Sequence, residues 1–163
     1  MPALANDVIV FVLKSSHIRF HSFIDDLKPE EFAVQPIPGV NSVAWMLGHL
    51  TVVERRILGL FGGELPPLPD GFDVPFKTTK APATTQTGLG DPKELVTAFD
   101  AHRLKLIEAV AAASEEQLAS PLPMPIGVAK TLGDAAAFMA VHVGLHAGQI
   151  SVIRRSLGYP PVV

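Results

Sequence analysis

The stretch that decides the fold is TLGDAAAFMAVHVGLHAGQISVIRRSLG, residues 131–158. Thr131 followed by Asp134 matches a capping box that begins a helix, and the final glycine of the stretch is favourable at a helix end. At about 100° per residue, His142 and His146 fall in the middle of one stripe of this helix. The other members of that stripe are Ala135, Phe138, Met139, Leu145, Gln149 and Ile153. We therefore expect a buried helix that points both imidazoles into the protein.

Three other stretches show the apolar periodicity of amphipathic helices, separated by segments rich in proline and glycine. These helices are expected over residues 4–27, from a cap at Asn41 or Ser42 to Gly62–Gly63, and from a cap at Asp91 to about residue 113, before the last one over 132–157. A short helical turn is expected at 114–118, and no run is assigned to a strand. Four helices with long connections predict an all-α four-helix bundle in a single domain, residues 1–163.

The composition narrows the function classes. The 163 residues carry 13 Lys and Arg against 16 Asp and Glu, a formal net charge of −3, which provides no basic surface for a nucleic-acid backbone. The chain has no cysteine, so it offers no disulfide, no thiolate metal ligand and no cysteine nucleophile. Any thiol chemistry would therefore need a thiol from outside the protein.

The sequence shows no targeting feature. The apolar run at residues 8–13 has no basic segment before it and is too short for a signal peptide. Residues 135–153 approach the length of a membrane span, but two histidines, Gln149 and Ser151 interrupt them. We expect a cytoplasmic protein whose last helix is a core helix and not a membrane span.

Two buried imidazoles one helical turn apart suggest a metal site. A divalent cation would take one nitrogen lone pair from each ring, although other polar groups or water can also satisfy such a pair. A third histidine, His49, lies at the border of the apolar face of its helix, on the Trp45 side. Three imidazoles without a thiolate suit Zn, Ni, Fe or Cu better than Mg or Ca, and they leave positions open for water or substrate.

The motifs NSVAWMLGHL at residues 41–50 and HVGLHAGQI at residues 142–150 resemble the DinB-like superfamily, which includes DinB and YfiT-type proteins. The LKPEEF stretch at residues 27–32 and the helix spacing also fit, so the resemblance covers nearly the whole chain. It implies a four-helix bundle, commonly a homodimer, with a divalent metal such as Zn, Ni or Fe. By position, the ligands would be His49, His142 and His146. Many relatives have Arg where this chain has Ala147, so the role of that Arg cannot be carried over.

The resemblance also implies a class of reaction. Relatives include transferases and isomerases that use low-molecular-weight thiols, so it implies thiol transfer to, or isomerisation of, a small-molecule substrate. A bound ion lowers the pKa of a thiol or a water, toward about 7 for zinc-bound water. A metal-dependent hydrolase and a non-enzymatic, stress-related metal-binding dimer remain alternatives, as does haem ligation more distantly. The loop over residues 64–90 is the segment expected to cover the site.

Three further histidines lie away from the predicted site. His17 and His21 have the same spacing as the ligand pair, but they lie on the border of their helix stripe, where a solvated edge is expected. His17 is the nearer of the two to the stripe and could still support the site or contact substrate. His102 on the third helix is similarly marginal.

Polar residues near the predicted ligands have several possible roles. Glu54 points away from His49 and is expected to be a surface or interhelical charge. Arg56 shares the His49 side and could hold a substrate carboxylate, although a solvent-facing side chain is the commoner outcome. Gln149 could hydrogen-bond a ligand or a bound water.

The outer side of the last helix is lined by small residues, which are Ala136, Ala137, Ala140, Gly144, Ala147, Gly148 and Ser151. Small side chains allow another helix to approach closely. We expect this face to pack against a neighbouring helix or a second subunit.

Overall fold

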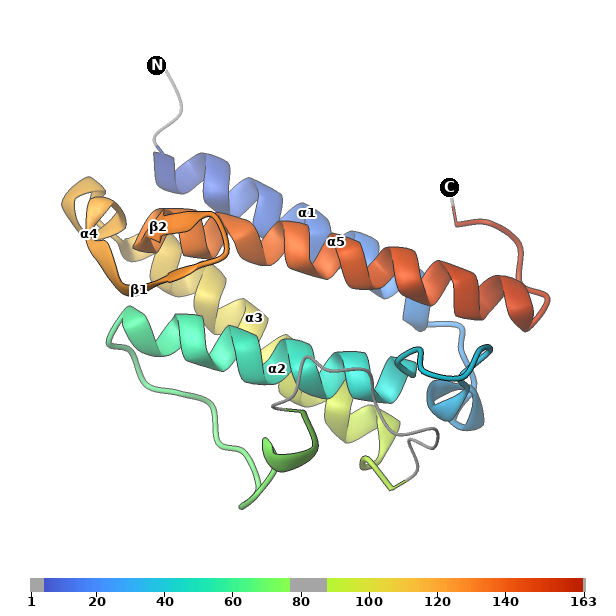
Figure 1. Cartoon of the computed structure of the whole chain (residues 1–163). Helices are drawn as coiled ribbons and strands as arrows, with labels where there is room; N and C mark the ends of the chain where they lie inside the picture. Colours follow the sequence, from blue (N-terminus) through green and yellow to red (C-terminus); the bar gives the residue numbers. More distant parts are fainter. Residues whose placement is uncertain (1–4, 77–87, 163) are drawn as a thin grey trace.

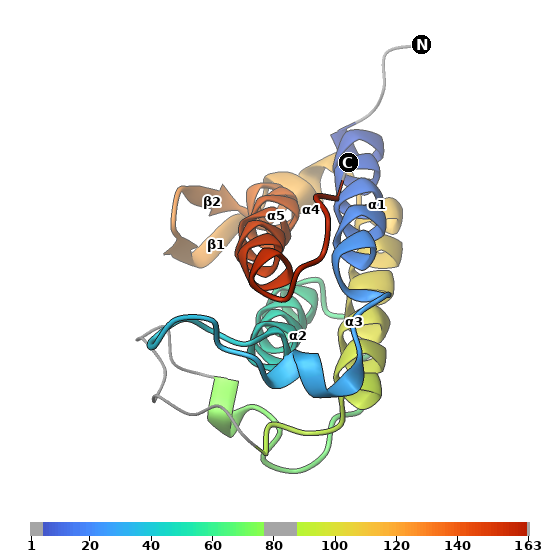
Figure 2. The same ribbon diagram turned by 90° about the vertical axis from the view of Figure 1, so that its right-hand side faces the viewer.

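The computed structural model describes residues 5–76 and 88–162. Its elements are α1 (Ala5–Ile24), η1 (Pro29–Ala33), α2 (Val43–Leu60), η2 (Val74–Phe76), α3 (Pro92–Ala112), α4 (Glu115–Ala119), β1 (Pro121–Ile126), β2 (Ala129–Thr131) and α5 (Leu132–Ser156). In the four-helix bundle, α1 packs along α5 and α2 packs along α3 (Figure 1). Viewed from the side, α2 and α5 form one face of the bundle while α1 and α3 form another (Figure 2). The predicted all-α bundle is confirmed.

Side-chain caps fix where three of the long helices begin. Ser42, and not Asn41, accepts a hydrogen bond from the backbone of Trp45 at the start of α2. Asp91 does the same for two amides at the start of α3, and Thr131 forms the expected capping box with Asp134. Each cap satisfies amides that have no partner within the helix.

The first helix ends earlier than its apolar pattern predicts. We expected it to continue to Leu27, but α1 ends at Ile24 and Leu27 is buried from a turn instead. The chain turns here because Arg154 of α5 pairs with Asp26 and donates to the Phe23 carbonyl at 3.1 Å. The expected start at residue 4 lies outside the described residues.

A two-stranded antiparallel hairpin, β1 with β2, lies between α4 and α5, where no strand was expected. Prolines at 121, 123 and 125 made the segment look like a loop, since proline cannot donate to a sheet. Alternate residues of a strand direct their amides to the same edge, so prolines spaced by two leave the other edge able to pair. The prediction that the chain contains no strand was therefore wrong for this segment.

One side of α5 faces the core of the bundle. Ala135, Met139, Val143, Ile150 and Ile153 are all buried. Leu145 was expected on the same stripe, but its side chain is 61% exposed, because the stripe that faces the core is narrower than the sequence pattern suggested. Within the described ranges, α5 is the one helix that is long and apolar enough to cross a membrane by length and composition, a test that core helices of soluble proteins also pass.

The small-residue face of α5 is split between two environments. Ala136 and Ala147 are buried within the bundle, so part of the face packs against neighbouring helices as expected. Gly144 and Gly148 are exposed. The exposed part is flanked by the apolar side chains Val141, Leu145 and Val152, which are 56%, 61% and 55% exposed.

Candidate metal centre

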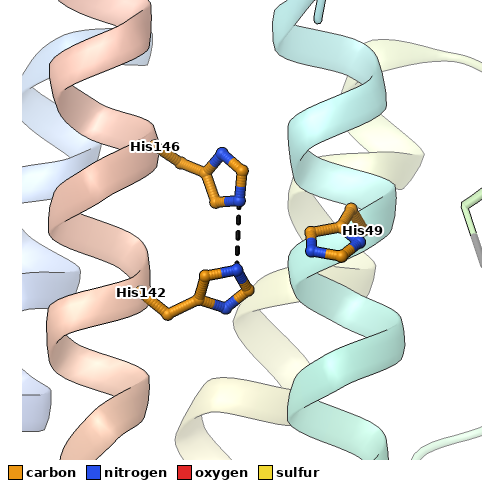
Figure 3. Close-up of side chains that lie close together, drawn as sticks. All are labelled: His49, His142 and His146. Atoms are coloured by element: carbon orange, nitrogen blue, oxygen red, sulfur yellow. Dashed lines mark hydrogen bonds between the residues drawn. The ribbon is translucent and has the colours of Figure 1, made fainter. Parts of the chain in front are cut away.

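Three histidines from two helices meet between α2 and α5 (Figure 3). His49 projects from α2 toward His142 and His146, which lie one above the other on α5. The centroid of the His49 ring lies 5.2 Å from that of His142 and 5.4 Å from that of His146. Each ring offers a nitrogen, and these nitrogens all lie within 4.8 Å of one another. This histidine trio could hold a metal ion.

Hydrogen bonds fix the tautomer of two rings in the trio. His49 Nδ1 lies 3.2 Å from the carbonyl oxygen of Phe76, and His146 Nδ1 lies 2.9 Å from Gln149 Oε1. Both partners are acceptors, so each Nδ1 carries the proton and donates it. In the neutral rings, the lone pair of His49 and that of His146 therefore lie on Nε2. A metal ligand needs that state. The His146 Nε2 lone pair accepts a hydrogen bond from His142 Nε2, which a bound cation would replace.

The spacing of His142 and His146 also fits a shared cation. Their Nε2 atoms are 3.2 Å apart. Two nitrogens bound at about 2.0–2.1 Å to one ion are separated by about 2.9–3.4 Å, depending on whether the geometry is octahedral or tetrahedral. His142 Nδ1 is buried with no hydrogen-bond partner in the described part of the chain, so no protein group there fixes the tautomer of this ring through Nδ1.

All three rings are held neutral by their surroundings. Burial, together with the charges of the other two histidines and of Arg103, lowers the pKa of His142 to about 3. Burial lowers the pKa of His146 to about 4, against the opposing effect of the Gln149 hydrogen bond. Burial also lowers the pKa of His49. Neutral imidazoles bind cations, so the trio is ready to bind a metal at neutral pH.

Residues of the long connection after α2 hold His49 in place. Phe76 of η2 is buried and lies against Gly48, where an added Cβ would overlap its ring. Trp45 stacks on the His49 ring at 4.8 Å and donates from Nε1 to the Pro75 carbonyl at 3.1 Å. The described part of the 64–90 segment thus contacts the trio, while residues 77–87 lie outside the described residues. The sequence led us to expect that this segment covers the site, but it did not identify Pro75 and Phe76, for which Gly48 on a buried helix face was the available signal.

Behind the trio lies a buried ion pair between Glu54 of α2 and Arg103 of α3. Arg103 also donates to the Met139 carbonyl of α5 at 3.3 Å and to Ser16 of α1 at 3.4 Å, so it joins all four long helices. Burial raises the pKa of Glu54 to about 7, and Arg103 opposes that effect. Of the two roles expected for Glu54, the structure therefore shows the interhelical one.

His17 and His21 do not lie on a solvated edge as expected. Both are partly buried between α1 and α3, where each Nε2 lies 2.8 Å from the same oxygen of Asp100. The prediction failed because their partner is about eighty residues away in the sequence. The ring of His17 is thus engaged with Asp100 of α3 and not with the trio.

The remaining predicted residues fall in three settings. Gln149 holds His146 as described above, although its side chain is otherwise exposed. Arg56 is exposed and lines a surface groove with Asp70 and Phe72. His102 is buried and lies 3.1 Å from Arg55, away from the trio.

Comparison with known proteins identifies the family. The model of the DinB superfamily matches residues 13–150, and the chain belongs to that superfamily. A search of curated proteins gives no significant match. The fold is similar to that of a crystal structure described as the conserved protein of locus from Enterococcus faecalis, with a TM-score of 0.71 and 17% identity over 93% of this chain and 96% of that one. At that identity the similarity concerns the fold alone.

Proposed function

We propose that this protein is a metal-dependent enzyme that acts on a small molecule, with His49, His142 and His146 holding one divalent ion. The observation that carries the proposal is the state of the rings, since two of them donate from Nδ1 to an acceptor and so have their lone pair on Nε2. Membership of the DinB superfamily supports it. Three nitrogen ligands favour Zn, Ni or Fe.

We further propose that the reaction uses a low-molecular-weight thiol, in a transfer or an isomerisation. When bound, a divalent ion with three neutral ligands keeps its full positive charge and lowers the pKa of a thiol or a water. The protein has no cysteine, so the thiol must be supplied from outside.

We propose that the recess lined by Gln149, the residue that holds His146, binds part of a small substrate. Its volume is about 210 Å³, and its lining includes Met46, Gln149, Val152 and Ile153. Most of these side chains are apolar, which favours an uncharged electrophile over a charged one. Gln149 links the recess to the trio, because it lines the recess and also accepts a hydrogen bond from His146.

Metal analysis tests the ligand assignment. The untagged protein should contain metal, and His49→Ala, His142→Ala and His146→Ala should each lose one ion per chain. The matched control is His102→Ala, which removes a buried histidine that does not face the trio and should keep that ion. Unchanged metal content in all three ligand variants would overturn the assignment.

Activity is tested with a thiol and 1-chloro-2,4-dinitrobenzene as the probe electrophile. The sulfur attacks the carbon that bears chlorine, a C–S bond forms and chloride leaves. We expect catalysis with at least one low-molecular-weight thiol. The rate should fall by at least about 100-fold in His142→Ala or after chelation of the metal. If the trio retains metal but no thiol or ester probe is turned over, the protein is a non-enzymatic metal-binding protein. If only esters are turned over, it is a hydrolase.

We also propose that a second copy of the chain covers the exposed face of α5. Val141, Leu145 and Val152 form one apolar line there, and the exposed Gly144 and Gly148 beside it allow close helix approach. Light scattering should show a dimer for the wild type and a monomer for Leu145→Asp. Leu104→Asp, at an exposed leucine of α3, is the control and should remain a dimer. A monomeric wild type would overturn this proposal.

A further inference from the structure

A second group of metal-ligating side chains lies between α1 and α3, and we call it the α1/α3 cluster. It consists of His17 and His21 from successive turns of α1 and Asp100 from α3. One potential ligand atom from each residue lies within 4.8 Å of the others. Because α1 and α3 form a different face of the bundle from α2 and α5, this cluster is separate from the trio (Figure 2).

The donor spacings of the α1/α3 cluster match those around a single ion. His17 Nε2 and His21 Nε2 are each 2.8 Å from Asp100 Oδ1. Adjacent ligands at about 2.0–2.2 Å from one cation are about 2.8–3.5 Å apart. The two imidazole rings meet edge to face with centroids 4.8 Å apart, so both can turn a nitrogen toward a common point.

A fourth residue orients one of the rings. His21 Nδ1 lies 2.8 Å from Asp25 Oδ1, one turn further along α1. A histidine ligand commonly donates its second N–H to a carboxylate in this way, which orients the ring. A metal ion would replace the proton that Nε2 donates to Asp100. The arrangement of Asp25, His21 and Asp100 is therefore that of a supported ligand and not of an isolated surface pair.

Two carboxylates lie in or next to the cluster. Within the described chain, the side-chain hydrogen-bond partners of Asp25 and Asp100 are histidines. A divalent ion would displace the ring protons that are donated to Asp100 and would neutralise the carboxylates in their place.

We propose that His17, His21 and Asp100 form a second divalent-metal site, with Asp25 orienting His21. Two imidazoles and one carboxylate suit a first-row transition ion such as Zn²⁺ and leave further positions open. The side chains of His17, His21 and Asp100 are 15%, 23% and 29% exposed, so those positions are accessible from water. The proposal does not depend on the proposed function, because no residue is shared with the trio.

Zinc titration of the metal-free full-length chain tests the proposal. The starting variant is His142→Ala/His146→Ala, which removes two members of the trio. By calorimetry it should still bind one Zn²⁺ per chain. Adding Asp100→Asn should weaken that binding by at least about 100-fold, and adding Asp25→Asn should weaken it by about 10- to 100-fold without changing the stoichiometry. Glu108→Gln, an exposed carboxylate on α3, is the matched control and should have no effect.

Nitrogen NMR of the imidazoles provides a second readout that does not depend on those variants folding. In the wild type, Zn²⁺ should shift the Nε2 resonances of His17 and His21 as well as those of the trio, and His21→Gln should abolish the shift at His17. The proposal is overturned if zinc leaves the His17 and His21 resonances unchanged. It is also overturned if the starting variant binds no Zn²⁺, or binds it equally well after Asp100→Asn.

Discussion

The two histidine groups of this protein differ in what surrounds the same side chain. In the trio the described residues place no carboxylate within hydrogen-bond distance, and burial lowers the pKa of His142 to about 3 and that of His146 to about 4. In the α1/α3 cluster, hydrogen bonds to Asp100 and Asp25 outweigh burial and raise the pKa of His21 to about 9. Spacing along the helix is identical in both groups, so the partner on the facing helix decides the charge of an imidazole.

This difference has a consequence for metal binding. The trio needs no deprotonation before it binds a cation at neutral pH, whereas in the α1/α3 cluster the cation must displace a proton from His21. We therefore expect the trio to bind the same metal more tightly than the cluster at neutral pH. The Glu54–Arg103 pair lies between the two groups and keeps their helices in register.

The largest effect is expected from breaking that central pair. Arg103→Met leaves Glu54 buried without a cation, which should lower the free energy of unfolding by about 3–5 kcal/mol. Urea denaturation measures this. The double variant Glu54→Leu/Arg103→Met removes both charges and should recover most of the loss. If the double variant is as unstable as the single one, the pair is not what joins the two groups.

The next largest effect should follow from disturbing the support of the trio alone. Gly48→Ala introduces a Cβ where the Phe76 ring lies, so the ring and the carbonyl that holds His49 must move. We expect a loss of about 1–3 kcal/mol in stability and at least about 10-fold in metal affinity at the trio. The control is Gly59→Ala, where the same methyl group meets open space. Equal metal affinity in Gly48→Ala and wild type would show that Phe76 does not position His49.

The two groups should respond to pH in opposite directions in the metal-free protein. The pKa values of His142 and His146 are lowered on folding. Their contribution to the free energy of unfolding is therefore present above about pH 6.5 and is lost as the pH falls toward 4 and 3. The loss should be about 1 kcal/mol per histidine for each pH unit at first. His142→Gln should flatten this acid slope.

For the α1/α3 cluster the sign is reversed. The pKa of His21 is raised on folding. Its contribution to the free energy of unfolding is therefore present below about pH 6.5 and is lost as the pH rises through about 9. The total loss of stability should be small because water partly screens these partly buried groups. His21→Gln should remove the alkaline slope and leave the acid slope intact. Stability curves at several pH values that show the same change in both variants would contradict the comparison.

The smallest effect should come from giving the trio a carboxylate of its own. Gln149→Glu places a negative charge beside His146 Nδ1, which should raise the pKa of His146 well above its value of about 4. NMR titration of the metal-free protein measures this. Gln149→Leu is the control and should leave the ring neutral over the same range. No rise in Gln149→Glu would mean that burial outweighs the new charge.

Much of the fold could be predicted from local sequence signals. The caps at Ser42, Asp91 and Thr131 act within a few residues, and each is present in the structure. The hairpin was missed because prolines at alternate positions can leave one strand edge free, which residue preferences alone do not reveal. The last turn expected for α1 was wrong because Asp26 pairs with Arg154, a contact across the whole chain.

In the candidate site, too, signals within one helix could be predicted and contacts between helices could not. His142 and His146 could be paired from their spacing on one helix. His49 could be added from its place at the border of the apolar face of its helix, and the family motifs supported it. The environment of His17 and His21 could not be predicted, because it depends on Asp100 in another helix. The same holds for Arg103, whose partner Glu54 lies forty-nine positions away. Sequence spacing thus identifies candidate ligands on a helix, while their charge depends on contacts between helices.

The hydrogen bond that holds His49 has an implication for how such proteins diverge. The acceptor is the main-chain oxygen of residue 76, and every amino acid provides that atom. Substitutions along the connecting segment can therefore alter what the protein admits without removing the acceptor, provided that the backbone keeps its course. Gly48 is less free to vary, since it makes room for the aromatic ring that fixes this course. Selection on new substrates would then be expected to spare Gly48 and to act on the connecting segment.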